Sequence, residues 1–451
     1  MKLVVAVLFN LGLLAVLVPW LWRQWRWAGP GWWQAVFTLG LGLRVGAGVA
    51  HNWPLHLDAS YMNRMGKYLT NLLWTDWPAF WQTFTGAIVT FKFSTYQAVY
   101  QSTSNTWFLI KILSLLNLGS LGSGLVNGIY LSVFAFVGCW QLVRALTECL
   151  PRTPAGAGAV ALLLWPTVWF WNTGLSKEAV LLSSGAWLVA RVLQALYGVR
   201  TSATSRGWAG WWLGSLTLAA LHFYMRYFFA MPLLGVLLGI GFAHGLQRLG
   251  LGRRHWVQAL CVALVLGAGL WLAPQLSVAF RINKFTNQLV RIHAHEVKFS
   301  NGLPHLSYPD LRPTVESIAA HAPLAALNTL TRPWLGEAKQ PMYIAASLEN
   351  LVLLGLIALA VLAKVRGRSG HLPFIWGLGL SIFCLILATL IGLTTPIFGL
   401  LSRYRSEMVP FLVLLLLQND YAAAVLRRLA RPKPEIEAPA PGDESPARPV
   451  A

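Results

Sequence analysis

The chain has 451 residues, of which 56% are hydrophobic and 11% are charged. Soluble globular proteins carry about 25% charged residues, so this composition excludes an ordinary soluble domain and indicates a surface that faces lipid. The formal net charge is +20, but the basic residues lie mainly in short loops between apolar segments. There they act as topology signals rather than as a nucleic-acid-binding patch, so nucleic acid is not an expected partner.

Apolar segments recur along the chain at the length that a membrane crossing needs, which is about 20 residues. Candidate spans cover residues 3–20, 32–50, 125–146, 156–172, 178–198, 208–224, 227–246, 256–275, 343–363, 372–392 and 406–426. The first is interpreted as a retained helix, because no A-x-A-like cleavage site follows it. A shorter stretch at 106–120 is interpreted as a half-helix. The predicted fold class is all-α, a polytopic integral membrane helical bundle with about eleven transmembrane helices.

Lysine and arginine residues in alternate short loops predict the orientation of this bundle. They are Arg23 and Arg26, Arg152, Arg200 and Arg206, Arg248, Arg253 and Arg254, Lys364, Arg366 and Arg368, and Arg427, Arg428 and Arg431. All of them lie on one side if the spans alternate as predicted, and the positive-inside rule identifies that side as the cytoplasm. The C-terminus is then cytoplasmic and the N-terminus outside, although Lys2 favours the opposite orientation of the first helix.

Two long segments, 51–124 and 276–342, fall on the outer face in this topology and are expected to carry amphipathic helices. In the second segment, apolar residues share one helical face and basic residues lie off it: Ile282, Phe285, Leu289 and Ile292, against Arg281, Lys284, Arg291 and Lys298. An interfacial helix attracted to anionic head groups and a helix packed on the bundle both fit this pattern. Residues 1–431 form the predicted transmembrane domain, and the Pro-, Ala- and acid-rich tail 432–451 is predicted to be disordered and cytoplasmic.

Asp58 follows the second predicted span on its outer side, and Tyr61 comes three residues later. Ionisable residues in or beside a span are costly, which makes them candidates for function. A carboxylate here can serve as a general base or ligate a divalent cation that holds a phosphate. The alternative is an N-cap for a helix that begins near Ala59, and the two roles are compatible.

Two predicted spans meet with almost no loop in the sequence WPTVWFWNTGLSKEAVLL (165–182), at the predicted outer face. Lys177 and Glu178 open the second of these helices. An acid in a first helical turn is favourable to the helix dipole, so capping is one explanation of Glu178. A Lys–Glu pair among Trp165, Trp169 and Trp171 at the membrane surface also fits a functional site.

Arginines in short outer connections are unexpected under the positive-inside rule and need a reason. Three arginines, together with one neighbouring tyrosine, occupy such positions: Arg226, Arg403, Tyr404 and Arg405. A fourth arginine, Arg332, lies at the end of the second long outer segment. Guanidinium groups bind phosphate through paired hydrogen bonds and stabilise charge on a phosphate leaving group. Ion pairing with Glu178, Glu349 or Glu407, or snorkelling to lipid head groups, is the alternative.

Two further patterns argue against metal and nucleotide sites. His293, His295 and Glu296 suggest a metal site, but helical residues two apart face away from each other, so an amphipathic surface is favoured. The run GSLGSGLVNG (119–128) lacks the lysine of a phosphate-binding loop, and the sequence contains no nucleotide-binding domain. A sugar or phosphate donor would therefore arrive attached to a lipid, or cross the membrane by transport.

Three patches of the chain resemble the C-type (GT-C) polyprenyl-phosphate-sugar glycosyltransferases, which include the aminoarabinose and protein O-mannosyl transferases. The patches are LRVGAG (43–48) with Asp58 and Tyr61, the outer helix start with Glu178, and the stretch from Arg403 to Pro410. The WFWNTGLSKEAVLL segment is also similar to one in membrane proteins of bacterial exopolysaccharide clusters. The chain departs from the family in an extra N-terminal helix and in having one acid, without an adjacent carboxylate, where the family often has two.

The resemblance implies an inverting glycosyltransferase of the bacterial inner membrane, which moves a sugar from a polyprenyl phosphate to a lipid-linked or surface acceptor at the extracytoplasmic face. It implies roles for the residues in these patches: Asp58 and Glu178 for catalysis, and Tyr61, Arg403, Tyr404 and Arg405 for substrate binding. The charge and position of Lys177, Arg226 and Arg332 make them further candidates for substrate binding. The resemblance also allows a divalent cation, Mg or Mn, without assigning a ligand. Two other functions stay open: an O-antigen or exopolysaccharide polymerase or ligase that uses lipid-diphosphate donors, and a lipid-linked saccharide transporter or flippase.

Overall fold

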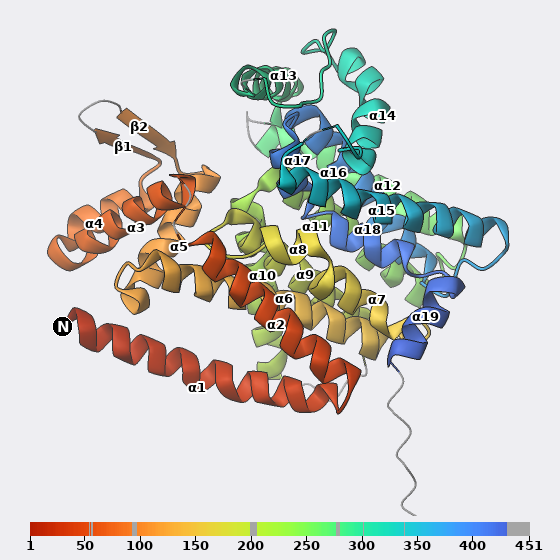
Figure 1. The fold of residues 1–451 in the computed structure, drawn as a ribbon, viewed down its shortest axis with the longest axis horizontal. Coiled ribbons are helices and arrows are strands. Elements are labelled where there is room, and N and C mark those ends of the chain that lie inside the picture. The colour runs from red at the N-terminus through yellow and green to blue at the C-terminus, as the bar shows by residue number, and fades with distance from the viewer. Residues whose placement is uncertain are drawn as a thin grey trace, which may run out of the picture.

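The computed structural model describes residues 1–430 apart from 54, 56, 93–96, 199–204, 277–279, 301 and 338. This part of the chain folds into helices and a two-stranded hairpin (Figure 1). Seven of its helices are long and apolar enough to cross a membrane: α1 (Lys2–Ala28), α6 (Gly124–Cys149), α9 (Lys177–Tyr197), α11 (Tyr227–Arg248), α12 (His255–Leu276), α15 (Pro341–Val365) and α16 (Phe374–Thr394). The helices α18 (Val409–Leu416) and α19 (Asp420–Ala430) meet at 95° and add an eighth crossing if they count as one span. The structure thus confirms the prediction of an all-α protein with several helices that can span a membrane.

The predicted number of eleven spans is not confirmed. Segment 32–50 forms α2 (Trp32–His51) and segment 208–224 forms α10 (Ser205–Met225), but neither is among the seven. Segment 156–172 is broken into α7 (Ala155–Ala159), a π-helical turn η1 (Val160–Leu164) and α8 (Pro166–Trp171). Pro166 explains the break, since proline has no amide hydrogen and disfavours the helical conformation of the residue before it. Trp165 is accordingly extended, with φ −65° and ψ 124°.

One buried and one half-buried charged side chain satisfy backbone groups that this break exposes. Arg44 of α2 is 0% exposed and donates to the carbonyl oxygens of Leu162 at 2.8 Å and Asn172 at 3.0 Å. Glu349 of α15 accepts from the backbone amide of Thr167 at 2.9 Å and thereby caps α8. Unpaired backbone groups are costly inside a membrane, so these contacts let the broken segment stay buried.

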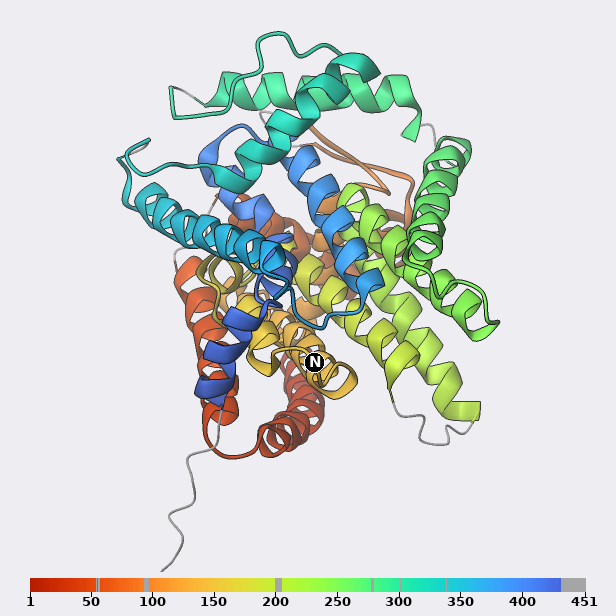
Figure 2. The same cartoon turned by 90° about the vertical axis from the view of Figure 1, so that its right-hand side faces the viewer.

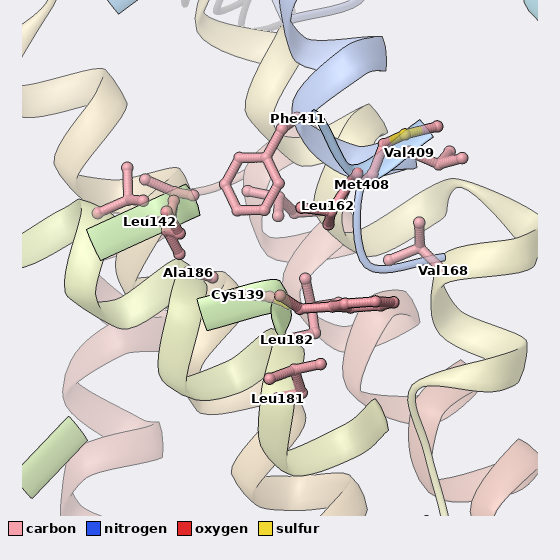
Figure 3. Packing of buried hydrophobic residues seen from close by; sticks show 14 of the residues in the cluster. Cys139, Leu142, Leu162, Val168, Leu181, Leu182, Ala186, Met408, Val409 and Phe411 are labelled. Carbon is pink, nitrogen blue, oxygen red and sulfur yellow. The ribbon is translucent and has the colours of Figure 1, made fainter. Parts of the chain in front are cut away.

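The core lies where α6, α9 and α18 meet (Figure 3). Cys139 of α6, Leu181 of α9 and Phe411 of α18 are all at least 98% buried there. Gly138 allows α6 and α9 to approach closely, because a Cβ at this position would collide with the backbone of Ser183. Small residues at such crossings are the usual means of tight packing between membrane helices. The start of α9, which carries Glu178, is therefore held on a rigid base.

The first predicted outer segment contains more structure than the sequence indicated. It forms α3 (Leu57–Thr75), α4 (Trp77–Thr85), β1 (Ile88–Lys92), β2 (Gln97–Gln101) and α5 (Asn105–Ser120). The strands are antiparallel, with Ile88 opposite Gln101, and this hairpin was not predicted. The predicted half-helix at 106–120 is α5. Tyr100 of β2 stacks on Trp107 of α5 with ring centroids 5.6 Å apart, which fixes the hairpin over the start of α5.

The second predicted outer segment forms α13 (Ile282–Phe299) and α14 (Val315–Thr331), which lie across one end of the bundle (Figures 1 and 2). The apolar face of α13 packs on the bundle: Leu289 is 2% exposed and Phe285 is half-buried, although Ile282 is exposed. The four basic residues of this helix are exposed. The helix therefore packs on the bundle and leaves its basic residues exposed. The predicted tail, 432–451, lies outside the described residues.

Acidification is expected to loosen α13 from the bundle. His293 is buried, and its Nδ1–H donates to the carbonyl oxygen of Leu393 at 3.1 Å. Burial lowers the pKa of His293 below its usual 6.5, so the folded state binds fewer protons than the unfolded state. Docking is then stable above pH 6.5 and weakens as the pH falls below it. Amide hydrogen exchange of α13 at pH 7.5 and 5.5 measures this effect, and the difference should disappear in His293→Gln.

Candidate functional site

Three elements bring charged side chains together at one buried point. Glu178 lies in the first turn of α9, Arg226 immediately precedes α11, and Arg403 lies in α17 (Phe398–Arg405). The Glu178 side chain is 0% exposed, with Oε2 at 2.8 Å from Arg403 Nη2 and Oε1 at 3.3 Å from Arg226 Nη2. A buried carboxylate depends on such partners, because it has lost its hydration. Glu178, Arg226 and Arg403 are called the Glu178 cluster.

Lys177 points away from its neighbour Glu178. Ser176 begins α9 as its N-cap, and its hydroxyl accepts from a first-turn amide at 3.2 Å. The Nζ of Lys177 donates instead to Asn105 Oδ1 at 3.1 Å and Thr106 Oγ1 at 2.7 Å, in the first turn of α5. The Lys–Glu pair read from the sequence is thus not an ion pair. It places two charges on different sides of the helix start.

Arg226 retains hydrogen-bonding capacity beyond its pair with Glu178. Its guanidinium carbon lies 3.9 Å from the ring centroid of Tyr404 and 4.9 Å from that of Phe229. Its Nη1 is buried and has no hydrogen-bond partner in the described part of the chain. Aromatic faces hold a guanidinium by cation–π attraction without using its N–H groups, so this donor is held in place and left unpaired.

The Glu178 cluster adjoins a cavity of about 710 Å³ that lies beneath α13. Apolar and polar side chains from several elements line it: Gln101, Thr103, Asn105, Arg226, Tyr227, Phe228, Phe229, Lys284, Phe285, Gln288, Leu289, Ile292, Glu296, Leu390, Thr394, Thr395, Leu400 and Tyr404. Arg226 is a member of the cluster and also lines the cavity, as does Tyr404, whose ring contacts the Arg226 guanidinium. Asn105 lines the cavity as well, and its side chain accepts a hydrogen bond from Lys177. A volume of this size accommodates the head group and first carbons of a lipid.

Asp58 lies on the second residue of α3, so it is in the first helical turn rather than at an N-cap before Ala59. It is exposed and has no hydrogen bond or ion pair with any described residue. It does not line the cavity. The Glu178 carboxylate mainly, and Tyr404 and Asp58 to a smaller extent, raise the pKa of Arg403. Tyr61 shares a hydrogen bond with the hydroxyl of Tyr100 on β2.

The structure does not bring Arg332 and Arg405 to the Glu178 cluster. Arg405 is 1% exposed and donates to the carbonyl oxygen of Arg332 at 2.9 Å and to Asn350 Oδ1 at 3.1 Å, which ties the end of α14 to α15. Arg332 pairs with Glu337, five residues away. Both arginines therefore have local structural partners, and the predicted phosphate contact is left to Arg226 and Arg403.

Two polar contributors to the site escaped the sequence reasoning. Asn105 and Thr106 accept hydrogen bonds from Lys177 and position it. In the sequence, an uncharged polar pair at the start of a helix indicates only a helix cap. Arg44, which supports the broken segment beneath the site, did give a signal, because a charged residue inside an apolar span is costly. His56, next to Asp58 in the sequence, lies outside the described residues.

No metal centre is assigned. Among the described residues, no three His, Cys, Asp or Glu side chains are grouped so that they could hold a metal ion. His293 faces the bundle, whereas His295 is exposed beside Glu296, with Nδ1 and Oε1 3.9 Å apart. Comparison with protein-family models, with curated proteins and with solved structures finds no match. The functional argument therefore depends on the geometry of the site alone.

Proposed function

We propose that the chain is a glycosyltransferase of the bacterial inner membrane, which moves a sugar from a polyprenyl-phosphate donor to a lipid-linked or surface acceptor. The reaction takes place at the extracytoplasmic face, and the C-terminus lies in the cytoplasm. The observation that carries the proposal is the position of Arg226, which lines a large, partly apolar cavity and is held there by its ion pair with Glu178 and by the ring of Tyr404. A fixed cationic donor beside apolar walls suits a ligand that joins a phosphate to a hydrocarbon chain.

The charges around the cavity favour an anionic ligand. Arg226, Arg403 and Lys177 contribute three positive charges, and the buried Glu178 balances one of them. At the cavity wall, Lys284 adds a fourth positive charge and Glu296 a second negative one, so the positive charges remain in excess. Guanidinium groups in a site shielded from water stabilise the charge that develops on a departing phosphate. The cluster is therefore suited to hold the phosphate of the donor before and after transfer.

In the proposed reaction the acceptor hydroxyl attacks the anomeric carbon of the donor sugar. Asp58 takes the hydroxyl proton, the new glycosidic bond forms, and the bond between that carbon and the phosphate oxygen breaks. The electron pair leaves with the lipid phosphate, whose charge Arg226 and Arg403 stabilise. Glu178 orients the two arginines. Asp58 suits the role of base because it is exposed and unpaired among the described residues.

A polymerase or ligase that uses lipid-diphosphate donors is the second candidate. It is favoured by one observation: Asp58 does not line the cavity, while arginine and lysine do. A transporter is less well supported. In a transporter, broken helices would leave backbone groups facing a substrate path near mid-membrane. Here Arg44 and Glu349 form hydrogen bonds with backbone groups at the break between α7 and α8.

Loss of a cavity cation is expected to weaken phosphate binding. Lys284→Gln and Arg226→Gln should each lower the affinity for citronellyl phosphate about tenfold or more, because a hydrogen bond to a charged group contributes about 1.5–3 kcal/mol. Calorimetric titration of the purified protein in nanodiscs measures this. Arg332→Gln is the matched control, since that arginine pairs with Glu337 away from the cavity. Equal affinities in all three variants would contradict the phosphate site.

A further inference from the structure

The cavity beneath α13 carries opposite charges at its two ends. Lys284 and Glu296, both on α13, line the same cavity. Their separation of twelve residues corresponds to about 18 Å along a helix that rises 1.5 Å per residue. Among the described lining residues Glu296 is the only acidic one. The cavity is therefore suited to a ligand that is anionic at one end and rich in hydrogen-bond donors at the other.

Aromatic contacts show which residues lie near the Lys284 end of α13. The ring centroids of Phe280 and Tyr227 are 5.3 Å apart, and those of Phe285 and Phe228 are 5.5 Å apart. The N-terminal half of α13 thus packs on the start of α11, next to Arg226. Lys284 and Arg226 therefore share one end of the cavity, which is the end proposed above for phosphate.

The other end of α13 packs on the end of α16. The hydrogen bond from His293 to the carbonyl oxygen of Leu393 fixes this contact. The next two residues of the chain, Thr394 and Thr395, line the cavity, and their hydroxyl oxygens are 3.3 Å apart. Glu296 lies one turn beyond His293, so a carboxylate and two neighbouring hydroxyls are grouped at this end.

Glu296 is an exception to the pattern of its helix. Apart from Lys284 near the start of the helix, the cavity face of α13 is otherwise apolar or uncharged, with Phe285, Leu289 and Ile292 along it. Among the described residues, the basic side chain found beside the Glu296 carboxylate is His295, whose Nδ1 is 3.9 Å from Oε1 and whose side chain is 63% exposed. Packing alone would favour an apolar residue here. The carboxylate keeps most of its acceptor capacity free, since each of its oxygens can accept two hydrogen bonds.

We infer that Glu296, Thr394 and Thr395 form a subsite for the hydroxyl groups of a saccharide. A carboxylate accepts hydrogen bonds from sugar hydroxyls, and threonine hydroxyls both donate and accept, so the group matches a polyol and not a second phosphate. The inference deepens the proposed function and rests on it, because the donor phosphate occupies the Arg226 and Lys284 end of the cavity. The saccharide in the subsite is then the donor sugar or the acceptor. Glu296 binds and positions the sugar and takes no part in bond breaking.

Carboxylate footprinting tests the subsite directly. The purified full chain in phosphatidylcholine nanodiscs is treated with a water-soluble carbodiimide and glycine ethyl ester, and modification of Glu296 is measured by peptide mass spectrometry. The probes are the methyl glycosides of glucose, galactose, mannose and N-acetylglucosamine, the same sugars linked to citronellyl phosphate, and citronellyl phosphate alone. Glu316, exposed on α14 away from the cavity, is the internal reference.

The expected result is several-fold protection of Glu296 by at least one sugar-bearing probe, with Glu316 unchanged. Protection by free glycosides identifies an acceptor sugar, and protection only by the phosphate-linked forms identifies the donor sugar. Glu296→Gln should weaken binding of the protecting probe about tenfold and leave citronellyl phosphate binding unchanged. The inference is overturned if no sugar-bearing probe protects Glu296, or if citronellyl phosphate alone protects it equally. Failure of the proposed function is distinct, since citronellyl phosphate would then not bind at all.

Discussion

Replacing Glu178 with glutamine is expected to destabilise the fold by about 3–5 kcal/mol and to abolish transfer. The substitution keeps the size of the side chain and removes the charge that balances two arginines. Arg226 and Arg403 would then lose the carboxylate with which both pair, in a largely buried place, at 12% and 25% side-chain exposure. Unfolding of the purified protein in mixed micelles by a denaturing detergent, and transfer of radiolabelled sugar from polyprenyl-phosphate donors in proteoliposomes, measure the two effects.

The size of this effect separates an ion-pair role from simple capping. An acid that only favours the dipole at a helix start contributes about 0.3–1 kcal/mol. Glu148→Gln is the matched control, because Glu148 pairs with Arg144 at 2.7 Å on the exposed surface of α6. Such a pair contributes about 0.3–0.5 kcal/mol. If Glu178→Gln destabilises the protein no more than Glu148→Gln, the buried cluster is not the organising feature of the site.

A double variant tests whether the arginines depend on the carboxylate. In Glu178→Gln with Arg403→Gln, one of the two uncompensated charges is removed together with its partner. Part of the lost stability should therefore return, since neutral groups of similar shape replace a buried pair at little cost. Transfer should stay absent, because both the phosphate contact and its orienting acid are missing.

The members of the Glu178 cluster could be predicted from the sequence, but their contact could not. Glu178, Arg226 and Arg403 each stood out as a charged residue beside an apolar run, where charge is costly. Glu178 and Arg403 are 225 positions apart in the chain, and no local pattern relates such distant residues. Their meeting depends on how α9, α11 and α17 pack, which is a property of the whole bundle.

The same signal led to Arg332 and Arg405, which the structure places elsewhere. An arginine in an outer connection can bind a ligand, or it can satisfy the carbonyl groups that a helix leaves unpaired at its end. Arg405 does the second at the end of α14. The sequence around Arg405, in which Arg403 is only two residues away, does not distinguish these uses, because they differ in the partner and not in the arginine.

Helix positions were predicted better than membrane crossings. The apolar length of segments 32–50 and 208–224 correctly indicated the helices α2 and α10. Whether such a helix crosses the bilayer depends on its apolar character over a full span, and neither helix is among the seven that qualify. The cavity was beyond sequence reasoning for a related reason: it exists only because α13 packs across the ends of α11 and α16.

Asp58→Asn is expected to lower the rate of transfer by about 10²–10⁴-fold, the usual contribution of a general base. The amide keeps the shape of the side chain but cannot accept the proton of the acceptor hydroxyl. Stability should not change, because Asp58 is exposed and unpaired among the described residues. Binding of citronellyl phosphate should also be retained, since Asp58 does not line the cavity. A loss confined to turnover is therefore the signature of the proposed base.

Asp76→Asn is the matched control on the same outer segment. Asp76 is exposed and caps α4, where its Oδ1 accepts from the amide of Ala79 at 3.0 Å. Asparagine caps helices about as well as aspartate, so this variant should keep both stability and transfer. If Asp58→Asn also keeps near-normal transfer while Lys284→Gln and Arg226→Gln lose binding, no acid on α3 takes the proton. The arginines then act without an obligatory base, and the lipid-diphosphate polymerase or ligase becomes the better account of this site.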